Sequence, residues 1–433
     1  MLRSASDKLY EKLIEEEECH KITSLYVLAP VMSMFVLWVI NEALQSKKER
    51  LYFLARDGYS MYHVADKICK ELKLPIQCKY LHCSRYAWRS AEFNLLGEES
   101  LEYICLGGID VTFKKVMKRA GLSEEEGLEI AKLLGKEKEF EMPMAYQQVK
   151  ALRPVLAGCK PFMDKLKRLG EESYPAVCGY LEQEGLLTDG KWAIVDSGWT
   201  GSMQKSLRHI LESMGYKDKL DGYYFGMYEN PSEEDLSGYH PWYFSPKSNI
   251  KRKVYFSNSL FECIYSATEG MTLGYVQENG QFEPILEKKE SPNMAQIVES
   301  TQLLVLYIEQ LITENGMAIL SNMEYNGEVA YLLLSLFMGK PMKEEAEYFG
   351  NYVFCDDVIG EEAQTIAAHL TKDEIKANRF LYKATNFIRK NGKAVKESAW
   401  LEGSIVLCPN LSEKETWHSA FYKYLLYIRK NLK

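Results

Sequence analysis

Short apolar runs alternate with amphipathic segments along the first half of the chain, which predicts strands followed by helices. The run LYFLA at 51–55 predicts a buried strand, and apolar positions at helical spacing predict a helix over 61–72. A second strand-like run, IQCKYLHCS, follows Pro75 after a short break. A parallel strand-helix-strand unit is the simplest interpretation.

The same pattern returns after residue 190. An apolar run at 192–195 ends in Asp196, a helix is expected in GSMQKSLRHILESMG behind it, and DGYYFGMY predicts a further buried strand. The fold class is therefore α/β, with a Rossmann-like parallel sheet.

Helical patterning dominates the rest of the sequence. We expect a core formed by 1–90 and 187–290, a helical insertion or cap at 91–186, and a helical C-terminal domain at 291–433. The role of the C-terminal domain stays open between acceptor binding, dimerisation and docking on a membrane surface.

The apolar stretch at 22–40 raises the question of a membrane span. It contains Pro30 and several hydroxyl side chains, and its apolar residues recur at helical spacing. A buried helix that opens the α/β unit fits this pattern better than a span does. Peripheral contact with a membrane surface remains open.

Composition and charge limit the classes of partner that the protein is expected to bind. The chain has 433 residues, of which 53 are Lys or Arg and 61 are Asp or Glu, for a net charge of −8. Without a dense basic face, nucleic acid is not expected as a partner.

Ten cysteines are scattered without CxxC pairs and no signal-peptide pattern precedes them, so a reduced, cytoplasmic protein is expected. The spacing of Cys78, His82 and Cys83 matches no common zinc site.

The first turn with chemical interest is ARDGYS, after the first strand. Gly58 would let the backbone approach a ligand, while Arg56 adds a charge with bidentate geometry, so the turn can hold a diphosphate. The alternative is an ordinary turn in which Asp57 caps the next helix.

The second turn, DSGWTGS, combines hydroxyls and glycines at the start of a helix. Thr200 and Ser202 can donate to phosphate oxygens, and Asp196 can accept from sugar hydroxyls or bind a metal. The remaining candidates of this turn are Ser197, Gly198, Trp199 and Gly201. The alternative is that Thr200 or Ser202 is only the N-cap of the helix.

This second turn resembles the donor-binding motif of type I phosphoribosyltransferases, which use phosphoribosyl diphosphate (PRPP). Asp196, Thr200 and Gly201 stand at matching positions. Val195 replaces one of the two adjacent acidic residues usual in that family, and Met203 stands where a late hydroxyl is expected. ARDG resembles the family's diphosphate loop and occurs in the right order.

A longer resemblance covers about 25–275. APVMSMFVLWVINEA, LYFLARDGYSM, KYLHCSR, VDSGWTGSMQ, DGYYFG and LFECIYSATEGMTLGY are similar to the region after the haloacid-dehalogenase-like phosphatase domain in bacterial polysaccharide-biosynthesis proteins. The resemblance implies a phosphoribosyltransferase-like module that moves 5-phosphoribose from PRPP to a glycan or lipid-linked glycan in capsule or O-antigen assembly. A separate phosphatase would then remove the 5-phosphate. The phosphatase signature D-x-D is missing here, because Tyr59 stands at the second position.

For that reaction, Arg56, Asp57 and Gly58 are assigned to the diphosphate, with Mg²⁺ assisting, and Thr200, Gly201 and Ser202 to the 5-phosphate. Asp196 and Glu262 are the candidate general bases, with Asp57 as an alternative.

Three further side chains are weaker candidates. Arg85 follows the second strand and can reach a phosphate or form an ion pair. Gln204 lies one turn into the second helix, and Trp199 can pack on a sugar or fill the core. His63 and His209 are expected on helix surfaces.

Two other functions stay open: a haloacid-dehalogenase-like sugar phosphatase, and a non-catalytic subunit that binds a phosphosugar. The acceptor, the linkage and the oligomeric state do not follow from the sequence.

Overall fold

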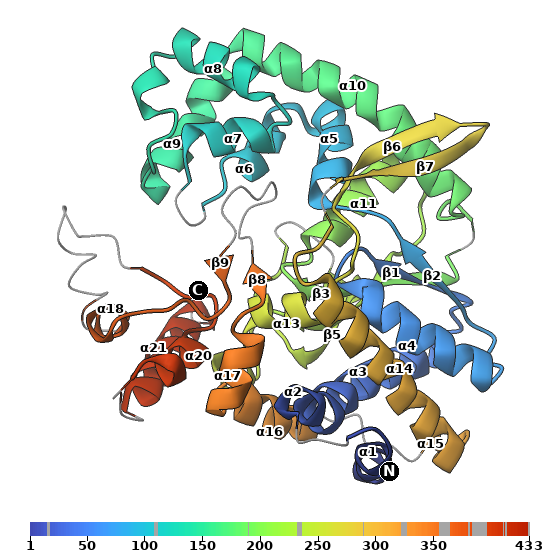
Figure 1. The fold of residues 1–433 in the computed structure, drawn as a ribbon. Helices are drawn as coiled ribbons and strands as arrows, with labels where there is room; N and C mark the ends of the chain where they lie inside the picture. Colours follow the sequence, from blue (N-terminus) through green and yellow to red (C-terminus); the bar gives the residue numbers. More distant parts are fainter. Residues whose placement is uncertain are drawn as a thin grey trace.

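A five-stranded, fully parallel sheet forms the centre of the protein, in the order β2-β1-β3-β4-β5 (Figure 1). The strands are β1 (Arg50–Leu54), β2 (Gln77–Leu81), β3 (Trp192–Trp199), β4 (Asp221–Met227) and β5 (Tyr239–Phe244). The computed structural model describes residues 1–14, 18–107, 111–188, 190–231, 236–288, 290–321, 327–354, 364–379, 382, 396–409, 411 and 414–431. The expected mixed α/β class with a parallel sheet is confirmed.

The order of the strands reverses between β1 and β3. In register, Phe53 of β1 pairs with Val195 of β3, and Leu54 pairs with Leu81 of β2 on the other side. A doubly wound sheet of this order has its switch point at the carboxyl ends of β1 and β3, where such sheets bind ligands.

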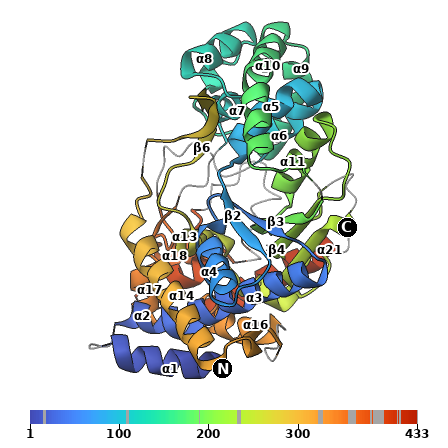
Figure 2. The ribbon, with the colours of Figure 1, turned by 90° about the vertical axis from the view of Figure 1, so that its right-hand side faces the viewer.

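Helices cover both faces of this sheet (Figure 2). Leu51 and Phe53 point into a core shared with α3 (Ala29–Gln45), α4 (Gly58–Glu71), α13 (Asn258–Tyr265) and α14 (Met294–Asn315). Tyr52 and Leu54 point to the other face, where α5 (Arg85–Leu96), α10 (Lys160–Gln183) and α11 (Ser202–Ser213) pack. This alternation follows from the two-residue period of a strand.

The apolar N-terminal stretch is a buried helix. After α1 (Leu2–Leu13), α2 (Cys19–Thr23) runs through a π-helical turn, η1 (Ser24–Leu28), into α3, with Pro30 in the first turn. Length and composition would allow Cys19–Gln45 to span a membrane, but 78% of its most apolar window is buried within the protein.

The segment between α5 and α10 builds a helical insertion with its own apolar core. It contains η2 (Gly97–Ser100), α6 (Leu101–Ile104), α7 (Phe113–Arg119), α8 (Glu124–Leu133), η3 (Glu137–Glu139) and α9 (Tyr146–Ala157). Because α5 begins three residues after β2, the insertion is attached at the carboxyl edge of the sheet (Figures 1 and 2).

An antiparallel hairpin of β6 (Thr272–Glu278) and β7 (Gln281–Leu286) packs against α10 and α5. Tyr275 stacks on Tyr180 with ring centroids 4.3 Å apart, and its hydroxyl donates to the carbonyl of His82 at 2.8 Å. The hairpin therefore holds the junction of β2 and α5.

Much of the region after 291, where a helical domain is expected, packs into the large core, and a small apolar cluster of Ala368, Leu370, Ile375 and Ile405 lies within the region itself. Tyr307 and Ile308 of α14 share the large core with the N-terminal helices and the sheet, and α14 lies beside α4 (Figure 1). The sequence does not predict this packing, because an amphipathic pattern shows which face of a helix is apolar but not what that face packs against. The other elements are η4 (Leu236–Gly238), α12 (Ile250–Val254), α15 (Ala318–Ser321), α16 (Gly327–Phe337), α17 (Lys343–Phe349), β8 (Val353–Phe354), β9 (Gln364–Thr365), α18 (Lys372–Ala377), α20 (Leu401–Leu407) and α21 (Lys414–Asn431).

The close approach of α10 to α5 gives a test of the fold. A Cβ added to Gly170 would lie 2.5 Å from the backbone nitrogen of Asn94. We expect Gly170→Val to lower the free energy of unfolding by about 1–3 kcal/mol in urea denaturation, because the helices must separate. Gly274→Ala is the control, since nothing lies within 4 Å of its added Cβ. Equal stability of the two variants would contradict this packing.

Candidate functional site at the switch point

The end of β1 delivers Arg56, Asp57 and Gly58 to the carboxyl edge of the sheet. Gly58 begins α4 against β1, where an added Cβ would lie 2.9 Å from the carbonyl carbon of Phe53. Asp57 occupies the N-cap position of α4, but its side chain makes no capping hydrogen bond. The capping alternative for Asp57 is therefore not observed.

The carboxylate of Asp57 instead reaches the neighbouring β3. The hydroxyl of Ser197 donates a hydrogen bond to Oδ2 of Asp57. This bond joins the two predicted turns, although 140 residues separate them in the sequence.

β3 is longer than the predicted strand and carries Asp196, Ser197, Gly198 and Trp199 itself. The carboxylate of Asp196 accepts hydrogen bonds from the backbone N–H groups of Ser197 and Gly198. Gly198 has φ +105°, and an added Cβ would lie 2.7 Å from the carbonyl oxygen of Gly226. Glycine is required here by both the backbone conformation and the contact.

Glu262 comes to the site from α13. The indole N–H of Trp199 donates to Oε1 of Glu262 at 2.5 Å. The Trp199 ring itself is buried among Phe244, Phe256 and Phe261. The ring of Trp199 therefore fills the core, which is one of its two expected roles. Its indole N–H orients the carboxylate of Glu262.

Arg85 is a cation whose charge acts on all three of these carboxylates, Asp57, Asp196 and Glu262. It is exposed in the first turn of α5. The preceding Ser84 caps α5 and donates to the carbonyl of Thr272 at 2.6 Å. The hairpin therefore positions Arg85 through Ser84.

Burial is the main cause that raises the pKa values of the three carboxyl groups. Burial, with the charge of Asp57 adding to it, raises the pKa of Asp196 to about 7. The same two causes raise the pKa of Glu262 to about 8. Burial also raises the pKa of Asp57, while Ser197, Arg56 and Arg85 oppose the shift.

The N-terminus of α11 has no side-chain cap. Gly201, with φ +64°, is the N-cap residue and no side chain caps the helix, so neither Thr200 nor Ser202 acts as the cap. Both of these residues are partly exposed. The helices α4 and α11 follow β1 and β3, the two strands that flank the switch point. No side chain caps the first N–H groups of either helix.

Gln204 is placed differently from the other candidates. Its buried amide donates to the carbonyls of Leu220 and Gly238 at 2.9 and 3.1 Å and accepts from the hydroxyl of Tyr224. Both N–H donors and the carbonyl oxygen of its amide are bonded within the fold, so the side chain points away from the switch-point carboxylates.

The two histidines expected on helix surfaces also have internal contacts. His63 is half-buried on α4 with its ring against Tyr59, rather than lying on the helix surface. His209 joins α11 to α5, because its Nδ1 lies 2.9 Å from the buried Glu92.

Two groups beside the turn after β1 were not found from the sequence. The hydroxyl of Tyr80 donates to Oε1 of Glu269 at 2.6 Å, and the charge of Arg56 acts on Tyr80. Glu269 follows Glu262 in the quoted motif LFECIYSATEG, but its approach to β2 depends on the path of the chain.

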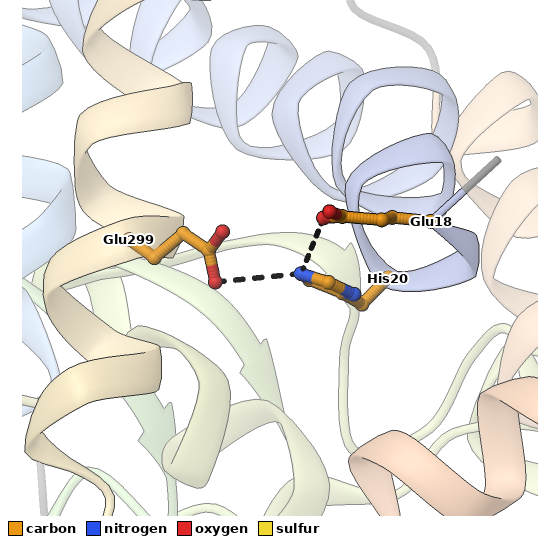
Figure 3. A group of neighbouring side chains, drawn as sticks. All are labelled: Glu18, His20 and Glu299. Atoms are coloured by element: carbon orange, nitrogen blue, oxygen red, sulfur yellow. Dashed lines mark ion pairs between the residues drawn. The ribbon is translucent and has the colours of Figure 1, made fainter. Parts of the chain in front are cut away.

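A second acidic group lies away from the switch point. Glu18, His20 and Glu299 bring their ligand atoms within 4.8 Å of one another (Figure 3), and no other group of three potential metal ligands among the described residues does so. Lys21 lies 2.5 Å from Glu18 and 4.0 Å from Glu299, so a resident cation already balances this group. Cys78, His82 and Cys83 form no such group, and none of the cysteines that the structure describes forms a disulfide.

Comparison with known proteins adds no assignment. No protein-family model matches the chain, and no curated protein sequence matches it.

The raised pKa values predict how stability depends on pH. At pH values between the ordinary carboxyl pKa and the raised pKa values of about 7 and 8, the folded state binds more protons than the unfolded state. The free energy of unfolding should therefore fall as pH rises from 5 to 8. Asp196→Asn should reduce this fall by about 1–3 kcal/mol in urea denaturation, because the amide does not titrate.

The control is Asp164→Asn, a change at an exposed carboxyl group of α10. It should keep the wild-type dependence on pH. If Asp196→Asn also kept it, the raised pKa of Asp196 at the switch point would be refuted.

Proposed function

We propose that the protein is a glycosyltransferase of phosphoribosyltransferase type, which moves 5-phosphoribose from PRPP to a glycan acceptor in surface-polysaccharide biosynthesis. The observation that carries the proposal is the convergence of Asp57, Asp196, Glu262 and Arg85 at the β1/β3 switch point, between two helix N-termini that no side chain caps.

The two ends of PRPP match the two turns. The diphosphate is assigned to the start of α4, with Arg56 and Gly58, and Arg85 supplies a second positive charge from α5. The 5-phosphate is assigned to the start of α11, where the backbone and the hydroxyls of Thr200 and Ser202 can donate. The ribose then lies over Asp196 and Ser197.

Carboxyl oxygens also fit the Mg²⁺ that accompanies a diphosphate, because this ion is held by one or two carboxylates together with substrate phosphates. Asp57 and Asp196 are the residues assigned to it. These two residues would hold the ion, whose charge would offset that of the leaving diphosphate. A cation there would also favour the ionised form of both carboxyl groups, against the burial that raises their pKa values.

In the transfer step, the bond from C1 of ribose to the diphosphate oxygen breaks and a bond from C1 to an acceptor oxygen forms. The proton of the acceptor hydroxyl passes to a carboxylate, for which Glu262 is assigned and Asp196 is the alternative. A pKa of about 8 suits Glu262 to this task near neutral pH. Trp199 is a positioning residue, since it holds Oε1 of Glu262.

The phosphatase alternative has less support. Asp57 would be its nucleophile, but burial raises the pKa of that carboxyl, and Tyr59 stands where the D-x-D signature has its general-acid aspartate. Release of inorganic phosphate from a phosphosugar by the purified protein would favour it. A non-catalytic subunit would bind PRPP without consuming it.

Calorimetric titration with PRPP, with and without Mg²⁺, tests the donor site. We expect binding that Mg²⁺ strengthens, and weaker binding of ribose 5-phosphate and of diphosphate alone. Arg85→Ala should weaken PRPP binding about tenfold or more, because it removes a charge-assisted contact.

The matched control is Arg208→Ala, which changes an arginine of α11 that pairs with Glu212 at 3.4 Å. It should leave the affinity for PRPP unchanged. Absence of binding by folded wild-type protein would refute the proposed donor.

The pH dependence of turnover tests the general base. With a glycan acceptor, kcat/KM should rise with pH through about 7 to 8, because Glu262 must lose its proton to act. Glu262→Gln should lower kcat by about 100-fold or more and remove this rise, while PRPP binding persists. An unchanged pH profile in Glu262→Gln would assign the base elsewhere.

A further inference from the structure

A pocket of about 460 Å³ lies beyond the end of β5, where α12, α16 and α21 meet. One wall is the basic segment from Lys247 to Arg252, and the opposite wall contains Tyr331 of α16 and Tyr424 and Ile428 of α21. None of the residues that line this pocket belongs to the switch-point site. The proposed donor site does not use it.

The helix α21 carries an exposed apolar stripe that leads to this pocket. Trp417, Phe421, Tyr424 and Ile428 recur at the spacing of one helix face, and Trp417 is 62% exposed. The rings of Trp417 and Phe421 stack with their centroids 5.3 Å apart, and Phe421 is 42% exposed. A large indole on an exposed helix face is unusual in a helix that only covers a core.

The neighbouring α16 is exposed in the same manner. Leu332 and Leu336 are 60% and 63% exposed, and Val329 is exposed one turn earlier. Tyr331 and Glu328 of the same helix line the pocket. Two apolar helix faces therefore flank one basic pocket.

The charges of the pocket are mostly positive. Lys247 and Lys251 are exposed, and the structure gives neither of them an ion pair with a described residue. Arg252 pairs with Glu328 at 2.6 Å, and the buried Lys253 donates to the carbonyl of Pro246 at 2.6 Å. These contacts fix the basic segment while the two lysines remain turned to solvent.

We propose that the surface formed by α16, α21 and the segment 247–252 docks on an anionic phospholipid membrane. Exposed aliphatic and aromatic side chains enter the interface between headgroups and acyl chains, and Trp is favoured at that depth. Lys247 and Lys251 then contact the lipid phosphates. The apolar helix α3 has no part in this contact, because it is buried.

The complementary charge decides between this occupant and a second copy of the chain. In a two-fold dimer through this surface, the basic segment of one copy would face the same segment of the other copy, whereas an anionic lipid surface complements its charge. The inference does not depend on the proposed transfer reaction.

Co-sedimentation of the full chain with vesicles tests the proposal. We expect binding to vesicles of phosphatidylcholine with phosphatidylglycerol, and much weaker binding to phosphatidylcholine alone. The double change Lys247→Glu with Lys251→Glu should reduce binding to anionic vesicles by about tenfold or more, since each lysine near an anionic surface contributes to the affinity. Trp417→Ser with Phe421→Ser should reduce it similarly.

Two matched controls carry the same changes on the helical insertion. Leu133→Ser with Tyr146→Ser alters side chains that are 63% and 61% exposed, and Lys150→Glu with Lys160→Glu alters exposed lysines of α9 and α10. Both should bind vesicles as the wild type does. Asp196→Asn should also bind normally, which separates this result from any failure of the donor site.

Three results would overturn the proposal: no binding to anionic vesicles, equal binding to neutral ones, or equal loss in the controls. Analytical ultracentrifugation distinguishes membrane docking from self-association through this surface. A wild-type dimer that becomes monomeric in Trp417→Ser with Phe421→Ser would assign this surface to a second copy of the chain.

Discussion

The hydrogen bond from Ser197 to Asp57 is the contact on which the candidate site depends. It joins the end of β1 to the end of β3 at the one place where the strand order reverses. Because it draws the Asp57 carboxylate across the sheet, that group does not cap α4, and the first N–H groups of the helix remain uncapped by side chains. The site thus combines crowded negative charge with two helix ends that attract anions.

That combination is costly without a ligand, and the fold maintains it from three directions. The β6–β7 hairpin holds Arg85 through Ser84, the aromatic core holds Glu262 through Trp199, and backbone N–H groups hold Asp196. Each support is buried, while the groups that would meet a ligand are partly exposed. This arrangement is typical of a site that is organised before its ligand arrives.

Local patterns were sufficient to predict β1, β2, β3 and β4 and the helices behind them, because apolar period and turn residues act over a few positions. β5 was missed: its sequence YHPWYF contains Pro241 and forms an edge strand, where the pattern is weaker. Much of the region after 291 joins the large core, and periodicity could not predict this, since it does not identify the surface that a helix covers.

The candidate site residues also differ in how far the sequence could predict their placement. Asp57, Asp196 and Glu262 were chosen from their positions and influence one another in the fold. Gln204 shows the limit of this reasoning, because its place in the first turn of α11 did not reveal that its amide bonds inward. The direction of a side chain at a helix start depends on neighbouring strands, which only the topology supplies.

The most direct test of the donor site is a crystal structure of the protein with PRPP and Mn²⁺, in which anomalous scattering locates the ion. The account predicts the diphosphate at the start of α4, the 5-phosphate at the start of α11, and the ion beside Asp57 and Asp196. Density for PRPP at another surface, or the ion bound by Glu18, His20 and Glu299 with the switch point empty, would contradict it.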